Sequence, residues 1–483
     1  MSRSVALFRC DASAAIGAGH VMRCLAFAET LSWAGWSCRF ATRRESLAVA
    51  PALAASGHDV LVIDGSDDAL PLDGVGLTIV DHYGLGEAFE RSVGASGCTL
   101  VAFDDLADRR HHCDILVDPT PERTTESYRP YVPASARRLL GPRHAIVRRE
   151  WREARAARRP AAGPARRIIV SMGATDPSDA TSCVLMALAA SGIDAHIDVV
   201  LGAGAPHLQS VAKGIGGRMK LHINPPDLPA LTAKADLAIG AAGSSSFERA
   251  ALGLPAVLIQ LAENQRFIVA GFARAGAAES LPASLLEDAA ALGARIAALA
   301  ADGARLAAMS RAAASLTDGR GACRLLAAIA ERGKSRCGFE VTLRLVEGTD
   351  ETWLLDLQRQ PATRRFARNP EIPSAEQHAA WFARLLGDED RLLTIIESDG
   401  RAVGMIRFDK TSAAPVTFEI SIALDQDRHG EGLGAAGLAL VRRLAPGADL
   451  TATVLSENKA SRALFAAAGY RSCGPDRLLN RAV

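Results

Sequence analysis

The chain has 483 residues, of which 49% are hydrophobic, 23% charged and 5% aromatic, and its formal net charge is +1. This composition is typical of a folded globular protein and excludes a disordered or collagen-like chain. The near-neutral charge argues against a dedicated nucleic-acid-binding protein, which usually carries a strongly basic face. At roughly 150 residues per domain, the length predicts about three domains.

The nine cysteines form no Cys-x-x-Cys pair, and Cys24, Cys183 and Cys323 have apolar neighbours. This scattering predicts reduced, buried thiols rather than a disulfide or zinc framework, and we expect no metal site. No stretch approaches the ~18 apolar residues of a membrane helix, and the N-terminus has too short an apolar segment for a signal peptide. We therefore expect a cytoplasmic protein without nucleic-acid or membrane partners.

Residues 1–150 alternate short apolar runs with Ala- and Leu-rich helical stretches, which predicts a parallel βαβ sheet. The expected strands lie in SVALFR, DVLVID, LTIVDHY, TLVAFDD and DILVDP. In such sheets, ligands bind beyond the carboxyl ends of the strands. Polar residues follow several of these strands, namely Asp11, Asp81, His82, Tyr83, Asp104 and Asp105. Each aspartate is also compatible with a simple helix cap.

Residues 151–166 (WREARAARRPAAGPAR) mix charged residues with Ala, Pro and Gly, and we interpret them as a solvated connector. A second βα series follows over residues 166–333, with strands expected in RRIIVSMGATDP, AHIDVVLGAG, MKLHIN, ADLAIGAAG and PAVLIQLA. Two similar units joined by a connector predict a cleft between them. Residues 339–483 contain consecutive strands such as RLLTIIESDG and VTFEISIAL, which predicts a separate α+β domain.

The stretch AIGAGHVMRCLAFAETL (residues 15–31) places a histidine directly after a Gly-x-Gly turn. Gly17 and Gly19 permit a tight turn, and apolar residues then recur at helical spacing. His20 is therefore predicted in the first turn of a helix, where unpaired N–H groups and the positive end of the dipole favour an anion. By spacing alone, the motif favours a structural or phosphate-orienting histidine over a catalytic one.

A second turn of small residues lies in IGAAGSSSFERAALGLPAVLIQLAENQ (residues 239–265). It follows a strand and precedes a helix, so its backbone can approach a diphosphate closely. Glu248, one turn into that helix, is placed to accept hydrogen bonds from ribose hydroxyls, with a plain surface charge as the alternative. The polar residues after the next strand are expected to face the cleft, although Asn264 is also compatible with a plain turn.

The two α/β units resemble the GT-B glycosyltransferases of the MurG type, a pair of Rossmann-type domains. More narrowly, they resemble the pseudaminic acid pathway hydrolases that remove UDP from UDP-2,4-diacetamido-2,4,6-trideoxy-β-L-altropyranose. The motifs that carry this resemblance are FRCDASAAIGAGHVMRCLAFA, VDHYGL, FDDLADRRHHCDILVDPT, LLGPRHAIVRREW, SMGATDP and GSSSFERAALGLPAVLIQLAENQ. Cys10 stands where Ser or Ala is expected and Ala18 where a larger residue is frequent, and neither departure removes a reactive group.

The resemblance implies direct attack of water on the anomeric carbon, with UDP as the leaving group and His20 as the base. The chemistry is compatible, because an imidazole with an unperturbed pKa of about 6.5 can take a proton from water near neutral pH. The nucleotide-sugar site expected from these motifs and strand ends comprises Asp11, Gly17, Gly19, Asp81, Tyr83, Gly173, Gly243, Ser244, Ser245, Ser246, Glu248, Glu263, Asn264 and Gln265.

In the third domain, the segment from His429 to Gly434 (HGEGLG) follows a strand and precedes a helix. Such a loop directs successive N–H groups at a pyrophosphate. Together with the Asn-x-x-Ser start of a later helix, it makes residues 341–475 resemble the GNAT acyl-CoA acetyltransferases, which implies acetyl-CoA as the acyl donor. The implied contacts are Arg428, His429, Gly430, Gly432, Gly434 and Asn458. Glu419 is the candidate base for an amine, with a plain strand-surface carboxylate as the alternative.

The segment TRRFARNPEIPSAEQHAAWFARLL resembles the substrate side of the acetyltransferase of the same pathway, which acylates the 4-amino group of the UDP-sugar. Two residues depart from the GNAT pattern. His429 stands where Gln or Arg is usual, and Phe465 stands where many such enzymes have a tyrosine that protonates the departing thiolate. Phenylalanine cannot donate a proton, so either a water serves or the domain only binds partners.

The leading hypothesis is a bifunctional enzyme that N-acetylates a UDP-linked amino sugar and then removes UDP. A GT-B glycosyltransferase with an unrelated or degenerate GNAT domain is the first alternative. The equivalent hydrolase of a legionaminic-type pathway and a nucleotide-sugar sensor or scaffold also remain open. The leading hypothesis predicts a UDP-linked diacetamido or amino sugar and acetyl-CoA as the small-molecule partners.

Overall fold

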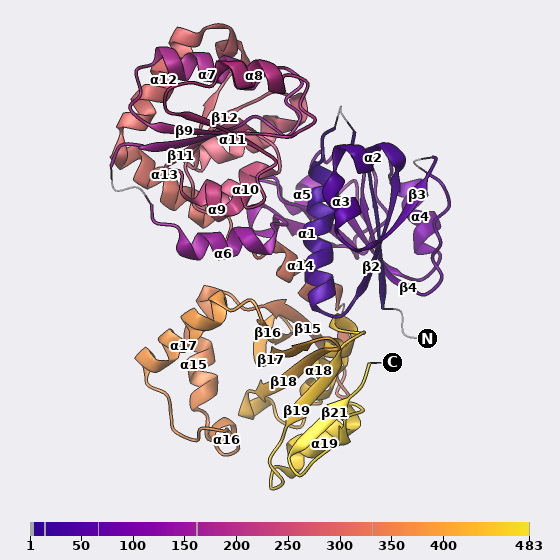
Figure 1. Cartoon of the computed structure of the whole chain (residues 1–483). Helices are drawn as coiled ribbons and strands as arrows, with labels where there is room; N and C mark the ends of the chain where they lie inside the picture. The colour runs from indigo at the N-terminus through magenta and orange to yellow at the C-terminus, as the bar shows by residue number, and fades with distance from the viewer. Residues whose placement is uncertain (1–3, 14–15, 66, 161–162, 331, 483) are drawn as a thin grey trace.

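The computed structural model describes residues 4–13, 16–65, 67–160, 163–330 and 332–482. Three β-sheets organise the chain, and the first two are entirely parallel whereas the third is mixed (Figure 1). This confirms the predicted α/β class, two Rossmann-type units followed by an α+β domain. Within the described ranges, no helix is both long enough and apolar enough to cross a membrane.

The N-terminal domain has a seven-stranded parallel sheet in the order β3-β2-β1-β4-β5-β6-β7. Its strands are β1 Val5–Cys10, β2 Ser37–Arg43, β3 Asp59–Ile63, β4 Val75–Asp81, β5 Thr99–Phe103, β6 Ile115–Asp118 and β7 Arg137–Leu140. Its helices are α1 Gly19–Trp33, α2 Arg44–Val49, α3 Pro51–Ala55, α4 Glu87–Gly94 and α5 Thr125–Tyr128. Because β2 and β4 lie on opposite sides of β1, the carboxyl ends of β1 and β4 border the crevice in which ligands of doubly wound sheets bind.

The second domain has a six-stranded parallel sheet in the order β10-β9-β8-β11-β12-β13. Its strands are β8 Arg167–Ser171, β9 His196–Leu201, β10 Met219–Ile223, β11 Leu237–Ala241, β12 Ala256–Ile259 and β13 Ala278–Leu281. Its helices are α7 Ala180–Ala190, α8 Leu208–Gly214, α9 Leu228–Ala233, α10 Ser245–Ala251, α11 Arg266–Arg274, α12 Ala289–Ala301 and α13 Gly303–Leu316. Every strand that the sequence predicted for this unit is confirmed.

The expectation of a solvated connector after residue 150 was wrong. Helix α6 (Arg149–Ala157) occupies this segment, and Trp151 on it is buried. Arg155 donates to the carbonyl oxygens of Ala251 at 2.6 Å and Thr317 at 3.1 Å, which lie at the carboxyl ends of α10 and α13. Arg155 therefore serves to satisfy helix ends of the second domain.

The C-terminal domain has a mixed sheet in the order β14-β15-β16-β17-β18-β19-β21-β20. Its strands are β14 Gly333–Lys334, β15 Glu340–Leu345, β16 Arg391–Ser398, β17 Arg401–Ala413, β18 Val416–Leu424, β19 Asp449–Thr453, β20 Arg471–Ser472 and β21 Arg477–Asn480. Its helices are α15 Glu351–Arg359, α16 Pro361–Arg364, α17 Ala375–Gly387, α18 Leu433–Leu444 and α19 Lys459–Ala467. The parallel pairing of β18 with β19 ends at Glu419, although β18 continues to Leu424.

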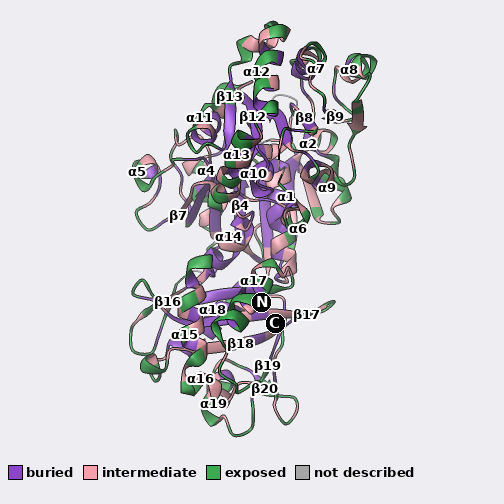
Figure 2. Cartoon of the chain, turned by 90° about the vertical axis from the view of Figure 1, so that its left-hand side faces the viewer, coloured by how far each residue is buried: buried purple, intermediate pink, exposed green. Residues whose placement is uncertain are grey.

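The N-terminal and C-terminal domains share one buried apolar cluster. At the far end of α1, the Trp33 ring packs on Phe418 with centroids 4.7 Å apart, and Trp36 Nε1–H donates to the carbonyl of Leu444 at 3.0 Å. Helix α14 (Gly321–Ile329) lies within the range expected for the second unit, yet its buried side chains join this same cluster. Buried residues concentrate on the strands in each domain (Figure 2). The acetyltransferase-like domain is therefore packed against the first domain, not tethered to it.

A substitution at the closest backbone approach between these two domains tests their docking. A Cβ on Gly447 would fall on the carbonyl oxygen of Gly35, well inside contact distance. We expect Gly447→Ala to lower the free energy of unfolding by about 1–3 kcal/mol, the usual cost of overpacking, measured by urea denaturation. Gly387→Ala is the matched control, because a Cβ there meets nothing within 4 Å. Equal stability of the two variants would contradict the docked arrangement.

Candidate active sites

His20 lies in the first turn of α1, at the crevice, as the sequence predicts. The turn before it depends on Gly17, whose φ of +74° favours glycine and whose N–H donates to the Ser13 carbonyl at 2.8 Å. The His20 side chain is 9% exposed, and its buried Nδ1 has no hydrogen-bond partner among the described residues. Burial lowers the pKa of His20, against the opposing charge of Asp81, so the imidazole is neutral at pH 7.

Asp81 ends β4 beneath His20, and its carboxylate is held by Arg23. Arg23 donates Nε and Nη2 to the two oxygens at 2.7 Å each, whereas His20 Nε2 lies 4.0 Å from Asp81 Oδ1. Burial alone would raise the pKa of Asp81, but the charge of Arg23 holds it below its ordinary value. Both oxygens are engaged, so Asp81 positions Arg23 and His20 and does not offer itself to the nucleotide sugar, which differs from the expectation.

Asp11 is also saturated, contrary to its expected role as a sugar ligand. The groups around its carboxylate are Arg9 Nη2 at 2.8 Å, Thr42 Oγ1 at 3.1 Å, the Arg43 N–H at 2.8 Å, Arg43 Nε at 3.2 Å and His82 Nε2 at 3.2 Å. His82 Nδ1 accepts from the Gly84 N–H at 3.0 Å, so His82 carries its proton on Nε2. Asp11 therefore fixes the loop that presents Tyr83.

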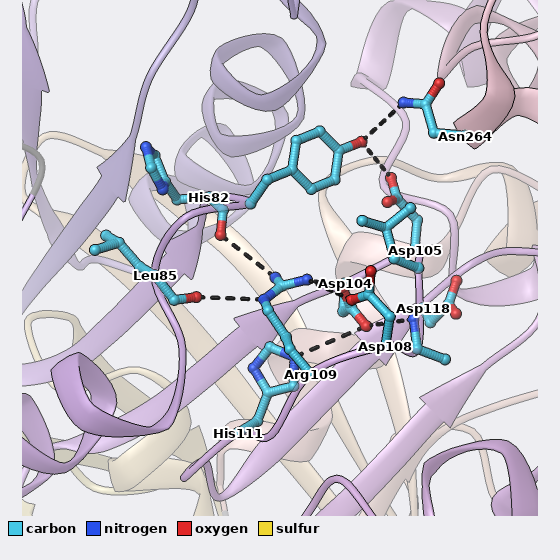
Figure 3. Close-up of polar contacts among 12 residues, drawn as sticks. His82, Leu85, Asp104, Asp105, Asp108, Arg109, His111, Asp118 and Asn264 are labelled. Carbon is cyan, nitrogen blue, oxygen red and sulfur yellow. Dashed lines mark hydrogen bonds and ion pairs between the residues drawn. The ribbon is translucent and has the colours of Figure 1, made fainter.

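Tyr83 joins the two walls of the cleft. Its hydroxyl donates to Asp105 Oδ2 at 3.3 Å and accepts from Asn264 Nδ2 at 3.3 Å, and Figure 3 shows Asn264 and Asp105 converging on it. Its ring also makes an edge contact with the His20 ring, with centroids 4.6 Å apart. Asn264 belongs to the second domain, so this hydrogen bond bridges the crevice directly beside His20.

The glycine-rich turns of the two domains face each other. A Cβ on Gly19 would lie 3.5 Å from the Ser244 hydroxyl oxygen, which precedes α10. The side chain of Ser246 is buried and accepts from Arg249 Nη2 at 3.2 Å, and its N–H donates to the Gly243 carbonyl at 2.9 Å, so both groups already have partners, which differs from the expectation. Gly173 follows β8 with a φ of +121° and open space on its Cβ side.

The other polar residues of the second domain that were expected to bind the nucleotide sugar differ in burial and in their hydrogen-bond partners. Glu248 is half-buried on α10, where burial raises its pKa despite the positive charge of Arg148. Glu263 is exposed and pairs with Arg266 at 2.8 Å. Gln265 accepts the Leu261 N–H at 2.9 Å and so closes its own turn. Of the three residues 263–265, Asn264 hydrogen-bonds to the first domain, whereas Glu263 and Gln265 contact neighbours in their own segment.

A buried charge network lies beneath the Tyr83 loop (Figure 3). Asp104 accepts from Arg109 Nη1 at 2.6 Å, and Arg109 also donates to the His82 carbonyl at 3.3 Å. His111 Nδ1 lies 2.7 Å from Glu90 Oε1, and its Nε2 lies 3.8 Å from Asp104 Oδ2. Burial alone would lower the pKa of His111, but its two carboxylate partners raise it to about 9. His111 is therefore charged at neutral pH and compensates two buried carboxylates.

The C-terminal domain places Glu419 where β18 and β19 part. Glu419 accepts from Thr453 Oγ1 at 2.8 Å and forms an ion pair with Arg368. Helix α18 begins directly after Gly432, whose φ is +80°. The N–H groups in the first turn of α18 therefore lie near the place where β18 and β19 stop pairing and the sheet opens.

The residues expected to bind acetyl-CoA differ in the contacts that they already make. Arg428 donates to Glu431 at 2.7 Å, and His429 Nε2 lies 3.3 Å from the Leu424 carbonyl. Asn458 caps α19 by accepting the Ser461 N–H at 3.1 Å. Gly434 lies inside α18, where a Cβ would press on the side chains of Leu424 and Leu464, so it serves packing and not the loop.

Arg336 is a residue that the sequence analysis missed. Its Nη2 donates to the Gly430 carbonyl at 2.6 Å, although the two residues are 94 positions apart. Gly430 has a φ of +87° and belongs to the loop before α18. A basic side chain therefore lies over that loop. No local motif marks it, because only the pairing of β14 and β15 brings its segment there.

Two further expectations concern metals and cysteines. In the part of the chain that the structure describes, no group of three or more His, Cys, Asp or Glu is arranged to hold a metal ion. The nine cysteines are free thiols. Cys24 is buried as expected, but Cys183 and Cys323 are half-buried, because each lies on a helix face that is only partly covered.

Residues 340–471 match the family model described as an acetyltransferase (GNAT) domain. The C-terminal domain is a GNAT domain. This family match covers only part of the chain. Other proteins match further parts of it.

A protein of Methanocaldococcus jannaschii described as uncharacterized is 25% identical over 269 residues, which cover 53% of this chain and 55% of that protein. The UDP-2,4-diacetamido-2,4,6-trideoxy-beta-L-altropyranose hydrolase of Campylobacter jejuni is 28% identical over 149 residues, covering 30% of this chain and 52% of the hydrolase. The chain therefore spans about half the length of these curated relatives. The crystal structure of Acinetobacter baumannii MurG matches with a TM-score of 0.47 at 15% identity, covering 66% of this chain and 97% of MurG.

The network around His111 predicts a pH-dependent stability. Because the folded pKa of about 9 exceeds the ordinary histidine value of 6.5, the stabilisation is complete below about pH 6.5 and is lost as the pH rises through 9. Its size is about 3 kcal/mol, from a difference of roughly 2.5 pKa units. Urea denaturation between pH 6 and 10 should show this loss in the unaltered protein and a flatter curve in His111→Gln. Parallel curves would show that His111 carries no charge in the folded state.

Proposed function

We propose that the chain is a bifunctional nucleotide-sugar enzyme of pseudaminic acid biosynthesis. The first two domains hydrolyse UDP-2,4-diacetamido-2,4,6-trideoxy-β-L-altropyranose to UDP and the free sugar. The GNAT domain transfers an acetyl group from acetyl-CoA to the 4-amino group of the UDP-linked precursor. The observation that carries the hydrolase assignment is the buried, neutral His20 that faces the second domain beside the Tyr83–Asn264 bridge. The Campylobacter jejuni hydrolase supports the choice of substrate.

In the hydrolysis, UDP binds to the second domain with its diphosphate at the turn from Gly243 to Ser246. Backbone N–H groups there hold the charge that develops on the leaving phosphate, so no strong general acid is required. Glu248 accepts from the ribose hydroxyls. The sugar then lies beside the Tyr83–Asn264 bridge, and His20 takes a proton from the attacking water.

In the acetyl transfer, the pyrophosphate of acetyl-CoA binds at the loop from Gly430 to Gly432, where the N–H groups of α18 are unpaired. The acetyl group enters the opening between β18 and β19. The amine nitrogen attacks the acetyl carbon, the C–S bond breaks, and Glu419 receives the amine proton. The thiolate takes its proton from water, because Phe465 has none to give.

Replacement of His20 tests the hydrolase assignment. We expect His20→Ala to bind the UDP-sugar as the unaltered protein does but to release UDP about a hundredfold more slowly, the usual scale for loss of a general base. UDP release is followed by a coupled assay and binding by calorimetry. His207→Ala, a change at a half-exposed histidine of the second domain, is the control and should have no effect. Unchanged turnover in His20→Ala would remove His20 from the mechanism.

Replacement of Glu419 tests the acetyltransferase assignment separately. We expect Glu419→Gln to release free thiol from acetyl-CoA at least about a hundredfold more slowly in the presence of the UDP-amino sugar. Hydrolysis of the diacetamido substrate by the same variant should be unaffected, because Glu419 lies in a different domain from His20. Thiol release at the normal rate would exclude Glu419 as the base. No thiol release by the unaltered protein would reduce the GNAT domain to a binding module.

A further inference from the structure

Asp105 is the carboxylate of the cleft that keeps an uncommitted oxygen. It follows β5, and its Oδ2 accepts from the Tyr83 hydroxyl at 3.3 Å. Its Oδ1 is buried and has no hydrogen-bond partner within the described ranges. The other strand-end carboxylates, Asp11, Asp81, Asp104 and Asp118, each have donors on both oxygens.

A buried carboxylate oxygen without a donor is costly and calls for an explanation. Charge compensation explains part of the arrangement, because Arg23 Nη1 lies 3.9 Å from Asp105 Oδ2. It leaves Oδ1 unexplained, so a donor other than the described residues is expected at that position.

His20 presents the same feature from the other side of Tyr83. Its Nδ1 is buried and unpartnered in the described chain, as Asp105 Oδ1 is. Tyr83 touches both groups, with its ring edge on His20 and its hydroxyl on Asp105. The two groups are close enough for the charge of each to change the pKa of the other. Two buried hydrogen-bond acceptors without partners among the described residues thus both lie on side chains in contact with Tyr83, beside the inter-domain bridge.

We propose that Asp105 is a second catalytic residue of the hydrolase site, which holds the attacking water together with His20. The water donates one O–H to His20 Nδ1 and the other to Asp105 Oδ1, which directs an oxygen lone pair at the anomeric carbon. A bond forms between this oxygen and the anomeric carbon while the bond from that carbon to the phosphate oxygen breaks. One water proton moves to His20, the second stays on the new sugar hydroxyl, and the electron pair leaves with UDP. This role rests on the proposed hydrolysis.

The test compares Asp105→Ala and Asp105→Asn with Asp73→Asn, a matched change at an exposed carboxylate of the same domain. We expect kcat for UDP release to fall about a hundredfold in Asp105→Ala, with KM changed by less than about threefold because the water, not the sugar, loses its partner. Asp105→Asn should be at least as stable to heat as the unaltered protein, since it removes a buried charge. Asp73→Asn should be unchanged.

Azide separates catalysis from mere structural support, because it attacks carbon without losing a proton. Asp105→Ala and His20→Ala should both form the glycosyl azide and UDP at a rate that rises with azide concentration. Wild-type kcat in both Asp105 variants would overturn the role of Asp105 and leave the hydrolysis intact. Loss of activity with loss of thermal stability and no azide product would show that Asp105 only supports the fold. No UDP release by the unaltered protein would overturn the proposed hydrolysis itself, and this role with it.

Discussion

The buried ion pair between Arg23 and Asp81 determines what His20 can do. An uncompensated carboxylate at about 4 Å would favour a protonated imidazole and so raise the pKa of His20. A charged His20 could not act as a base. Because Arg23 engages both oxygens of Asp81 at 2.7 Å, burial prevails and the pKa of His20 is lowered. The ion pair therefore helps to keep His20 neutral, so that it can accept a proton although an aspartate lies beside it.

The same helix connects this chemistry to the rest of the chain. Helix α1 has 15 residues and is therefore about 22 Å long, with His20 in its first turn and Trp33 at its end. Trp33 packs on Phe418, which precedes Glu419 on β18. The two proposed catalytic groups accordingly belong to one packed body formed by the first and third domains (Figure 1). The second domain meets this body at the crevice through Asn264 and Tyr83.

The sequence predicts the helices and strands and their ends better than it predicts which side chains bond to one another. Apolar runs located most strands of the first two domains but not β2, β7 or β13, and helical spacing after Gly19 located α1 and hence His20. Asp11 and Asp81 were correctly placed at strand ends, but the sequence could not reveal that their oxygens are occupied. Arg23 and Asp81 are 58 positions apart, and Thr42 and Asp11 are 31 apart, so only the fold brings them together.

Composition misled the analysis in one segment for a related physical reason. The arginines around residue 155 resemble a solvated stretch, but Arg155 satisfies carbonyl groups at the ends of α10 and α13. Arg336 escaped notice because its target, Gly430, lies on a distant loop. The side-chain oxygen of Asn458 already caps α19. A motif match to a cofactor-binding asparagine does not reveal this. In each case the deciding information is a contact, not a pattern.

In the proposed hydrolysis, water attacks the sugar carbon and leaves UDP intact. Hydrolysis of the UDP-sugar in ¹⁸O-labelled water, followed by ³¹P NMR of the β-phosphorus, tests it most directly. Attack at the anomeric carbon predicts UDP without an isotope shift and requires no acceptor other than water. An ¹⁸O-induced shift of the β-phosphorus would mean that the phosphorus is attacked instead, and would contradict the proposed mechanism.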